Sequence, residues 1–213
     1  MDGLTPIFPL ELVVYPGNAL NLHIFEPRYK QLIHDCAETK LPFGIPAVVN
    51  RSVGEFGTLM ELVEITHLNT ETGEMDIRTR GLKVFRIAHL EKLYPGKLYS
   101  AARVNYPDNE LTGDPEKMQA VVAAMKRLHA ILKVEKKFRE VEDGLTSYEV
   151  AQHVGLTLKQ EYELLGMFEE RERQEYLRQH LERVLSVVEE MEILKEKIKL
   201  NGHFRNLPGF PTT

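Results

Sequence analysis

Residues 8–33, FPLELVVYPGNALNLHIFEPRYKQLI, most constrain the fold because two breaker signals divide them into three segments. The Pro-Gly-Asn run at 16–18 predicts a turn between an apolar run at 12–15 and an alternating segment at 20–24. Pro27 suits the first position of a helix, where its missing N–H would be unpaired in any case. An apolar helix face then follows at i, i+3, i+4 and i+7: Tyr29, Leu32, Ile33 and Cys36. The stretch therefore predicts a strand, a tight turn, a second strand and a helix.

The rest of residues 1–106 reads mostly as strands. Alternating segments at 58–65 and 75–79 flank a turn at 69–73 and predict a hairpin. Gly81 breaks the run, and strands are expected to resume at 84–87 and, after Pro95-Gly96, at 98–106. A further apolar segment occupies 43–49, where Gly44 and Pro46 indicate a bulge or an edge. Many short strands with one helix inserted after the second predict a small barrel, closed or nearly closed.

The second half of the chain reads as helices. A turn-rich linker at 107–115 precedes a helix expected to run from Pro115 to about Arg139. Two capping boxes, at 146–149 and 157–160, open short helices, and Gly155 is expected to end the first of them. One long helix follows from about 169 to 200, with Gly202 as its stop. We therefore expect a barrel domain at 1–110, a helical bundle at 113–202 and a flexible tail at 203–213.

The long helix carries a heptad-like apolar pattern. Its members are Leu177, Leu181, Val184, Val188, Met191 and Ile198, with Leu185 and Leu194 widening the stripe. Its first part is expected to pack on the preceding helices. Beyond Val188 the pattern fits either a bundle helix or a helix that pairs with a second copy in a homodimer.

Composition excludes several classes of function. A net charge of −5 argues against nucleic-acid and anionic-membrane partners, because both bind positively charged surfaces. The single cysteine, Cys36, excludes an intramolecular disulfide and a multi-cysteine metal site. With no leader-like segment and no run of ~20 apolar residues, we expect a cytoplasmic protein without a membrane span.

No catalytic constellation is recognisable. The sequence has no G-x-x-x-x-G-K-[S/T] loop, none of its four serines lies in G-x-S-x-G, and its eight histidines show no H-E-x-x-H spacing. We therefore predict no enzyme activity, no catalytic or metal-ligating residues and no cofactor.

The words FPL, YPG and HIFEPRY, in that order, resemble the N-terminal domain of the Lon ATP-dependent proteases and their stand-alone relatives. The later run GLTLKQEYELLGMFEERERQEYL is also similar. The resemblance implies an α+β fold, in which a PUA-like β-barrel with one inserted helix precedes a helical bundle that ends in a long helix. It also implies a non-catalytic substrate-recognition module for proteolysis. The ATPase and Ser/Lys protease of Lon have no counterpart in these 213 residues.

The resemblance implies that the partners are unfolded or degron-bearing polypeptides, together with a protease or chaperone. A strand edge of the barrel could accept an extended peptide through main-chain hydrogen bonds. Candidate contacts either match the family motif or are aromatic residues beside turns: Tyr15, Pro16, Phe25, Glu26, Arg28, Tyr29, Phe43, Phe56 and Tyr94. For the motif residues a structural role is the competing interpretation, with Phe25 and Tyr29 in the core.

Nucleic-acid binding is the alternative function. Residues 146–165 mimic a helix-turn-helix, and a basic segment lies at 126–139 beside a barrel type that binds RNA elsewhere. Glu161 and Glu163 would face phosphates in the presumed recognition helix, which disfavours this alternative.

Overall fold

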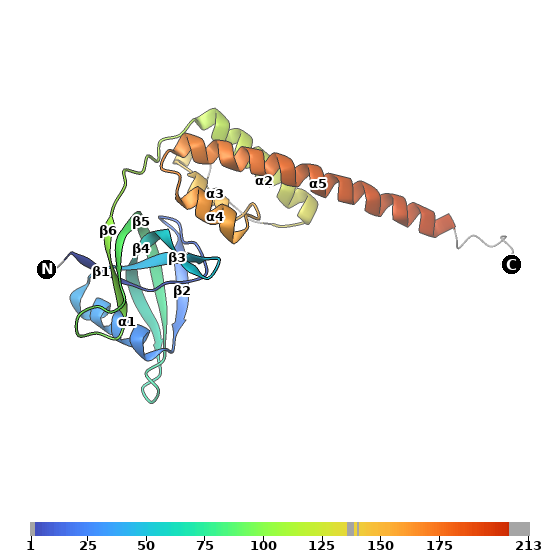
Figure 1. The fold of residues 1–213 in the computed structure, drawn as a ribbon. Helices are drawn as coiled ribbons and strands as arrows, with labels where there is room; N and C mark the ends of the chain where they lie inside the picture. Colours follow the sequence, from blue (N-terminus) through green and yellow to red (C-terminus); the bar gives the residue numbers. More distant parts are fainter. Residues whose placement is uncertain (1–2, 136–138, 140, 205–213) are drawn as a thin grey trace.

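The computed structural model describes residues 3–135, 139 and 141–204. A β-barrel forms the first half of the chain and a group of helices forms the second, and the last helix projects well beyond its neighbours (Figure 1). This is the α+β architecture predicted from the sequence.

The described part of the first half contains one sheet of six strands: β1 (Leu4–Ile7), β2 (Ala19–Ile24), β3 (Phe43–Val49), β4 (Ser52–Leu68), β5 (Met75–Glu91) and β6 (Ser100–Asn105). Neighbouring strands follow the order β5-β4-β3-β1-β6, and β6 pairs again with β5, so five strands close into a ring. β2 lies outside this ring and pairs with the first part of β5. All pairs are antiparallel except β1 with β3.

Most predicted strands are confirmed, and two expectations are wrong. The hairpin and the 43–49 strand are present, and the bulge expected near Pro46 lies between Pro46 and Val48. Gly81 does not break β5, because the strand runs through it. A Cβ at this position would lie 2.5 Å from the carbonyl oxygen of Tyr15, so glycine permits a close backbone approach. Residues 12–15 form no strand; the true first strand, β1, contains Pro6 and gives little sequence signal.

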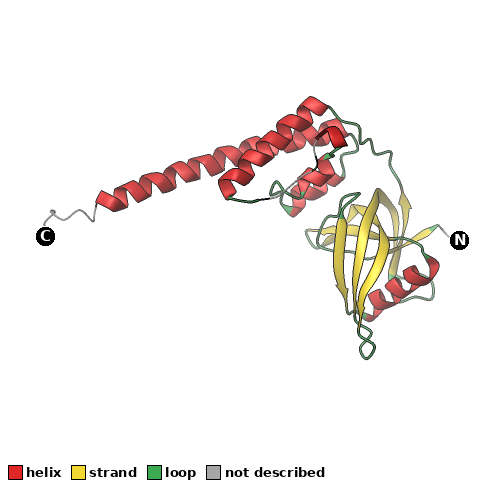
Figure 2. Cartoon of the chain, turned by 180° about the vertical axis from the view of Figure 1, so that it is seen from behind, coloured by secondary structure: helices red, strands yellow, loops and turns green. Residues whose placement is uncertain are grey.

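Helix α1 (Pro27–Thr39) covers the end of the barrel away from the other helices (Figure 2). Its predicted apolar face is confirmed, since Tyr29, Leu32, Ile33 and Cys36 are buried. They join the barrel core with Phe8, Phe43, Met60 and other apolar residues. Lys40 ends the helix in the left-handed conformation with φ of 57°.

The remaining helices are α2 (Pro115–Leu132), the 3₁₀ turn η1 (Val141–Asp143), α3 (Ser147–Ala151), α4 (Leu158–Leu165) and α5 (Glu170–Phe204). Both predicted capping boxes, at Thr146 and Thr157, are present. α2 ends earlier than predicted, because Lys133 takes the left-handed conformation with φ of 56°. Part of the expected extension, 136–138, lies outside the described residues. Gly202 does not stop α5, which continues to Phe204.

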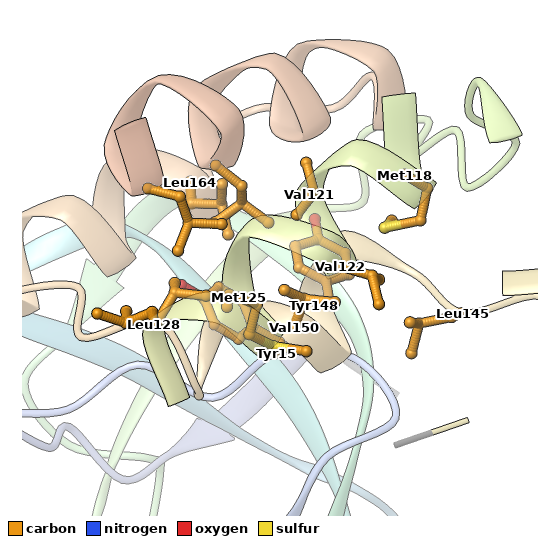
Figure 3. Close-up of a cluster of buried hydrophobic side chains, with 14 of the residues drawn as sticks. Tyr15, Met118, Val121, Val122, Met125, Leu128, Leu145, Tyr148, Val150 and Leu164 are labelled. Carbon is orange, nitrogen blue, oxygen red and sulfur yellow. The ribbon is translucent and has the colours of Figure 1, made fainter. Parts of the chain in front are cut away.

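Barrel and bundle share one buried cluster. Tyr15 enters it from the barrel side, among bundle residues such as Tyr148 and Leu164 (Figure 3). The Tyr15 and Tyr148 rings stack with centroids 5.1 Å apart, and the Tyr15 hydroxyl donates to the Glu161 carbonyl at 3.1 Å. On the other side of this contact, the Phe56 N–H donates to the Tyr162 hydroxyl at 3.1 Å. Because each bond joins a barrel residue to α3 or α4, the two halves pack as neighbours with a shared core.

A buried arginine fixes the linker against this core. Arg173 of α5 is fully buried and pairs with Glu170 at 2.8 Å. It also donates to the side-chain oxygen of Asn109 at 2.8 Å, and its guanidinium carbon lies 4.3 Å from the centre of the Tyr148 ring. A second guanidinium nitrogen donates to the Glu110 carbonyl. Its hydrogen bonds therefore reach the linker directly, and its contact with Tyr148 reaches the residue that stacks on Tyr15.

We expect Arg173→Met to lower the free energy of unfolding by about 3–5 kcal/mol, because it leaves the buried Glu170 carboxylate without its cation. Urea unfolding followed by circular dichroism measures the effect. Arg171→Met, at an exposed position of the same helix, is the matched control and should change stability by less than about 0.5 kcal/mol. Adding Glu170→Gln to Arg173→Met should recover part of the loss; equal losses for both arginine variants would contradict this role.

Candidate functional site

The second half of β4 is an open strand edge. β3 pairs with β4 only as far as the Phe43–Met60 pair. From residue 61 to 68, β4 pairs with β5 alone. Within the described part of the chain, no strand covers the other side of this segment. The main-chain N–H and C=O groups that point away from β5 are therefore available to another chain.

A cleft of about 640 Å³ lies along this edge. One wall is residues 61–65 of β4, and the other is the end of α1 with the loop that follows it. The lining residues of that second wall are Cys36, Ala37, Lys40, Leu41 and Pro42, and Leu82 of β5 completes the cleft. Lys40, in the left-handed conformation, ends α1, and the chain then enters β3, which pairs with β4 from Phe43 onward.

The cleft combines exposed apolar side chains with polar groups, among them the ammonium of Lys40. Three large aliphatic side chains in it are exposed: Leu41 by 52%, Val63 by 54% and Leu82 by 42%. The two acidic side chains on the rim are already paired across the hairpin. Glu61 lies 2.9 Å from Arg80, and Glu64 lies 2.5 Å from Arg78. The exposed aliphatic side chains offer contacts to an apolar ligand, and the two rim carboxylates are neutralised by their arginine partners.

The one thiol in the cleft wall is not a nucleophile. Burial, with a smaller contribution from the neighbouring Asp35 carboxylate, raises the pKa of Cys36 to about 12. The thiolate is the reactive form, so this cysteine is a packing residue near neutral pH. No group of three or more metal-ligating side chains was found among the described residues.

The nine candidate contact residues do not gather at this cleft, and none of them lines it. Tyr15, Tyr29 and Phe43 are buried in the cores, so they present no ring to a partner. Phe25 is 58% exposed, which corrects the expectation that it packs in the core.

The remaining candidates contact near neighbours. Glu26 and Arg28 form an ion pair with each other at 2.7 Å. Phe56 lies against Tyr162 and Phe168, Tyr94 lies against Tyr99, and Pro16 is half-buried.

The sequence analysis missed Leu41, Val63 and Leu82. One signal was available in the adjacent apolar pair Leu62-Val63, because it interrupts strict alternation. The register of β4 against β5 does shift between Leu62 and Glu64, which leaves Val63 in a bulge.

The helix-turn-helix-like segment at 146–165 packs against the rest of the protein. α4, the presumed recognition helix, packs on the barrel through the Tyr162 hydroxyl, while Leu164 and Leu165 are buried. A search of the described helices for one long and apolar enough to cross a membrane found none.

Comparisons with known proteins agree with this architecture. The model of the ATP-dependent protease La (LON) substrate-binding domain matches residues 5–183. A Lon N-terminal domain protein from Xanthomonas campestris superposes with a TM-score of 0.62 at 23% identity, covering 82% of this chain and 96% of that one. The N-terminal domain of Mycobacterium avium complex Lon protease gives a TM-score of 0.60 at 16% identity, covering 84% and 98%. No curated protein matches the sequence. Because the family model spans most of its length, the chain belongs to the Lon substrate-binding domain family.

Proposed function

We propose that this protein is a non-catalytic module that binds extended, apolar segments of unfolded or degron-bearing polypeptides along the open edge of β4. The observation that carries the proposal is the unpaired edge at 61–68 beside a cleft in which Leu41, Val63 and Leu82 are exposed. Membership of a substrate-binding domain family supports the same class of ligand.

In this mode the polypeptide adds a strand to β4. Main-chain hydrogen bonds supply sequence-independent attraction, and alternate side chains of the ligand enter the cleft. The eight-residue edge from 61 to 68 offers a track of roughly 26 Å at about 3.3 Å per residue. Ordering a flexible chain opposes these gains, so the affinity for one short peptide should be on the order of micromolar or weaker.

A module that binds without cleaving requires a partner that acts on the bound chain. We propose a protease or chaperone as that partner, in keeping with the protease named in the family description. Nucleic-acid binding is disfavoured, because α4 is docked on the barrel and the chain carries a net charge of −5.

We expect Val63→Asp or Leu41→Asp to weaken binding of a fluorescein-labelled apolar decapeptide by about tenfold or more, measured by fluorescence anisotropy. Each change removes an aliphatic contact and places a charge against the apolar ligand, and about 1.4 kcal/mol corresponds to a factor of ten. Leu93→Asp is the matched control, since Leu93 is 62% exposed on the same barrel and lies outside the cleft. A loss of the same size in the control would place the binding surface elsewhere.

Strand addition also makes a prediction about the ligand. Methylating every second backbone nitrogen of the decapeptide removes N–H donors and leaves the side chains unchanged. For one of the two alternating patterns the methylated nitrogens face β4, and that peptide should lose binding by about tenfold or more. The other pattern faces solvent and should bind nearly as well as the parent peptide. Equal affinities for all three peptides would show that main-chain pairing is not used.

A further inference from the structure

The projecting half of α5 carries an apolar stripe that its own bundle does not cover. Its members are Val187, Met191, Leu194 and Ile198, all more than half exposed. They repeat at spacings of four, three and four residues, which is the spacing of a coiled-coil seam. We call these four residues the α5 seam.

The α5 seam is distinct from the stripe that packs on the bundle. Leu177, Leu181 and Leu185 are buried, and Val184 and Val188 are partly buried against the same cluster. Because each residue advances about 100° around a helix, the two stripes point about a quarter turn apart. A partner helix can therefore lie along the α5 seam without displacing α2.

The seam begins where the bundle ends. About two turns before Val187, the same side of the helix carries His180, which is buried with its Nε2 atom 2.9 Å from the Val154 carbonyl oxygen. Beyond this point lies an apolar groove of about 370 Å³ between the end of α2 and the turn at 152–155. Val184 and Val188 of the bundle-facing stripe line the groove, and Val187, the first seam residue, lies between them in sequence. Exposed Leu132 and Val134 add to its apolar wall.

The charges beside the seam are self-complementary. In a coiled coil with Met191 and Ile198 at a positions, Glu190 occupies a g position, Lys195 an e position and Lys197 the next g position. In a parallel dimer, Glu190 of one copy would lie beside Lys195 of the other copy. In an antiparallel dimer, Glu190 of one copy would lie beside Lys197 of the other. In both orientations the contact is between opposite charges and occurs twice by symmetry. Lys195 also pairs with Glu192 of its own helix at 2.6 Å.

We propose that the α5 seam is the surface through which two copies of this chain associate, forming a two-helix coiled coil. Four apolar residues per copy make an interface at the small end of the range for stable dimers, so the association should be reversible and seen at high protein concentration. This inference is independent of the proposed peptide binding, since no residue of the cleft lies on α5.

Sedimentation velocity over a range of concentrations tests the proposal. The wild-type chain should show a reversible monomer–dimer equilibrium. Leu194→Glu should raise the dimer dissociation constant by about tenfold or more, because it buries two carboxylates in the seam. Ile193→Glu is the matched control, since Ile193 is 55% exposed on the opposite side of the same helix and should leave the equilibrium unchanged. Circular dichroism should show the bundle folded in both variants, because neither side chain lies in its core.

Charge reversal tests whether the partner is a second copy. Glu190→Lys should weaken the dimer, and the triple change E190K/K195E/K197E should restore it in either orientation. A strictly monomeric wild type, equal effects of the two glutamate variants, or a dimer that survives Leu194→Glu would each overturn the proposal. So would a Leu194→Glu variant that loses decapeptide binding while its dimer is unchanged, since the seam would then hold the ligand.

Discussion

The mismatch between long and short strands governs this structure. β4 and β5 are each 17 residues long, whereas β3 has seven and β6 has six. In a closed ring every strand pairs with two neighbours, and the short strands are long enough to pair with only part of the β4–β5 hairpin. The edge of β5 that faces away from β4 pairs first with β2, at residues 75–80, and then with β6, at residues 86–91. Among the residues that the structure describes, β4 has no second short strand on its outer side, so its surplus length remains an open edge.

The junction of barrel and bundle combines a shared apolar core with a few directional contacts. Tyr15 reaches out of the barrel to stack on Tyr148, and Arg173 holds Tyr148 and the linker from the other side. Apolar burial supplies the attraction, and the directional bonds fix one arrangement among the many that burial alone would permit. The cost of this design is a buried charge pair that tolerates the loss of neither partner.

The sequence predicted elements with local causes and failed where distant contacts decide. Pro27 and the apolar face at 29–36 specify α1, and the two capping boxes specify α3 and α4, because these signals act within one turn of helix. Gly81 was wrongly interpreted as a strand break. Glycine is needed there because the backbone of Tyr15, far away in sequence, lies too close for a side chain. The aromatic residues beside turns looked exposed by the same local logic, yet tertiary packing buries Tyr15 and Phe43. An open strand edge is a relation among three strands, so no local pattern could locate it fully.

The length of α5 has a consequence for the binding of long ligands. At about 1.5 Å per residue its 35 residues extend roughly 52 Å, and its C-terminal part projects beyond α2 (Figure 1). In the antiparallel orientation, two chains joined at these ends would carry their barrels far apart, each presenting one weak groove. An unfolded chain long enough to span both would be bound bivalently, with its second attachment governed by effective concentration rather than by bulk concentration. Short peptides gain nothing from such spacing, so the assembly would discriminate by ligand length.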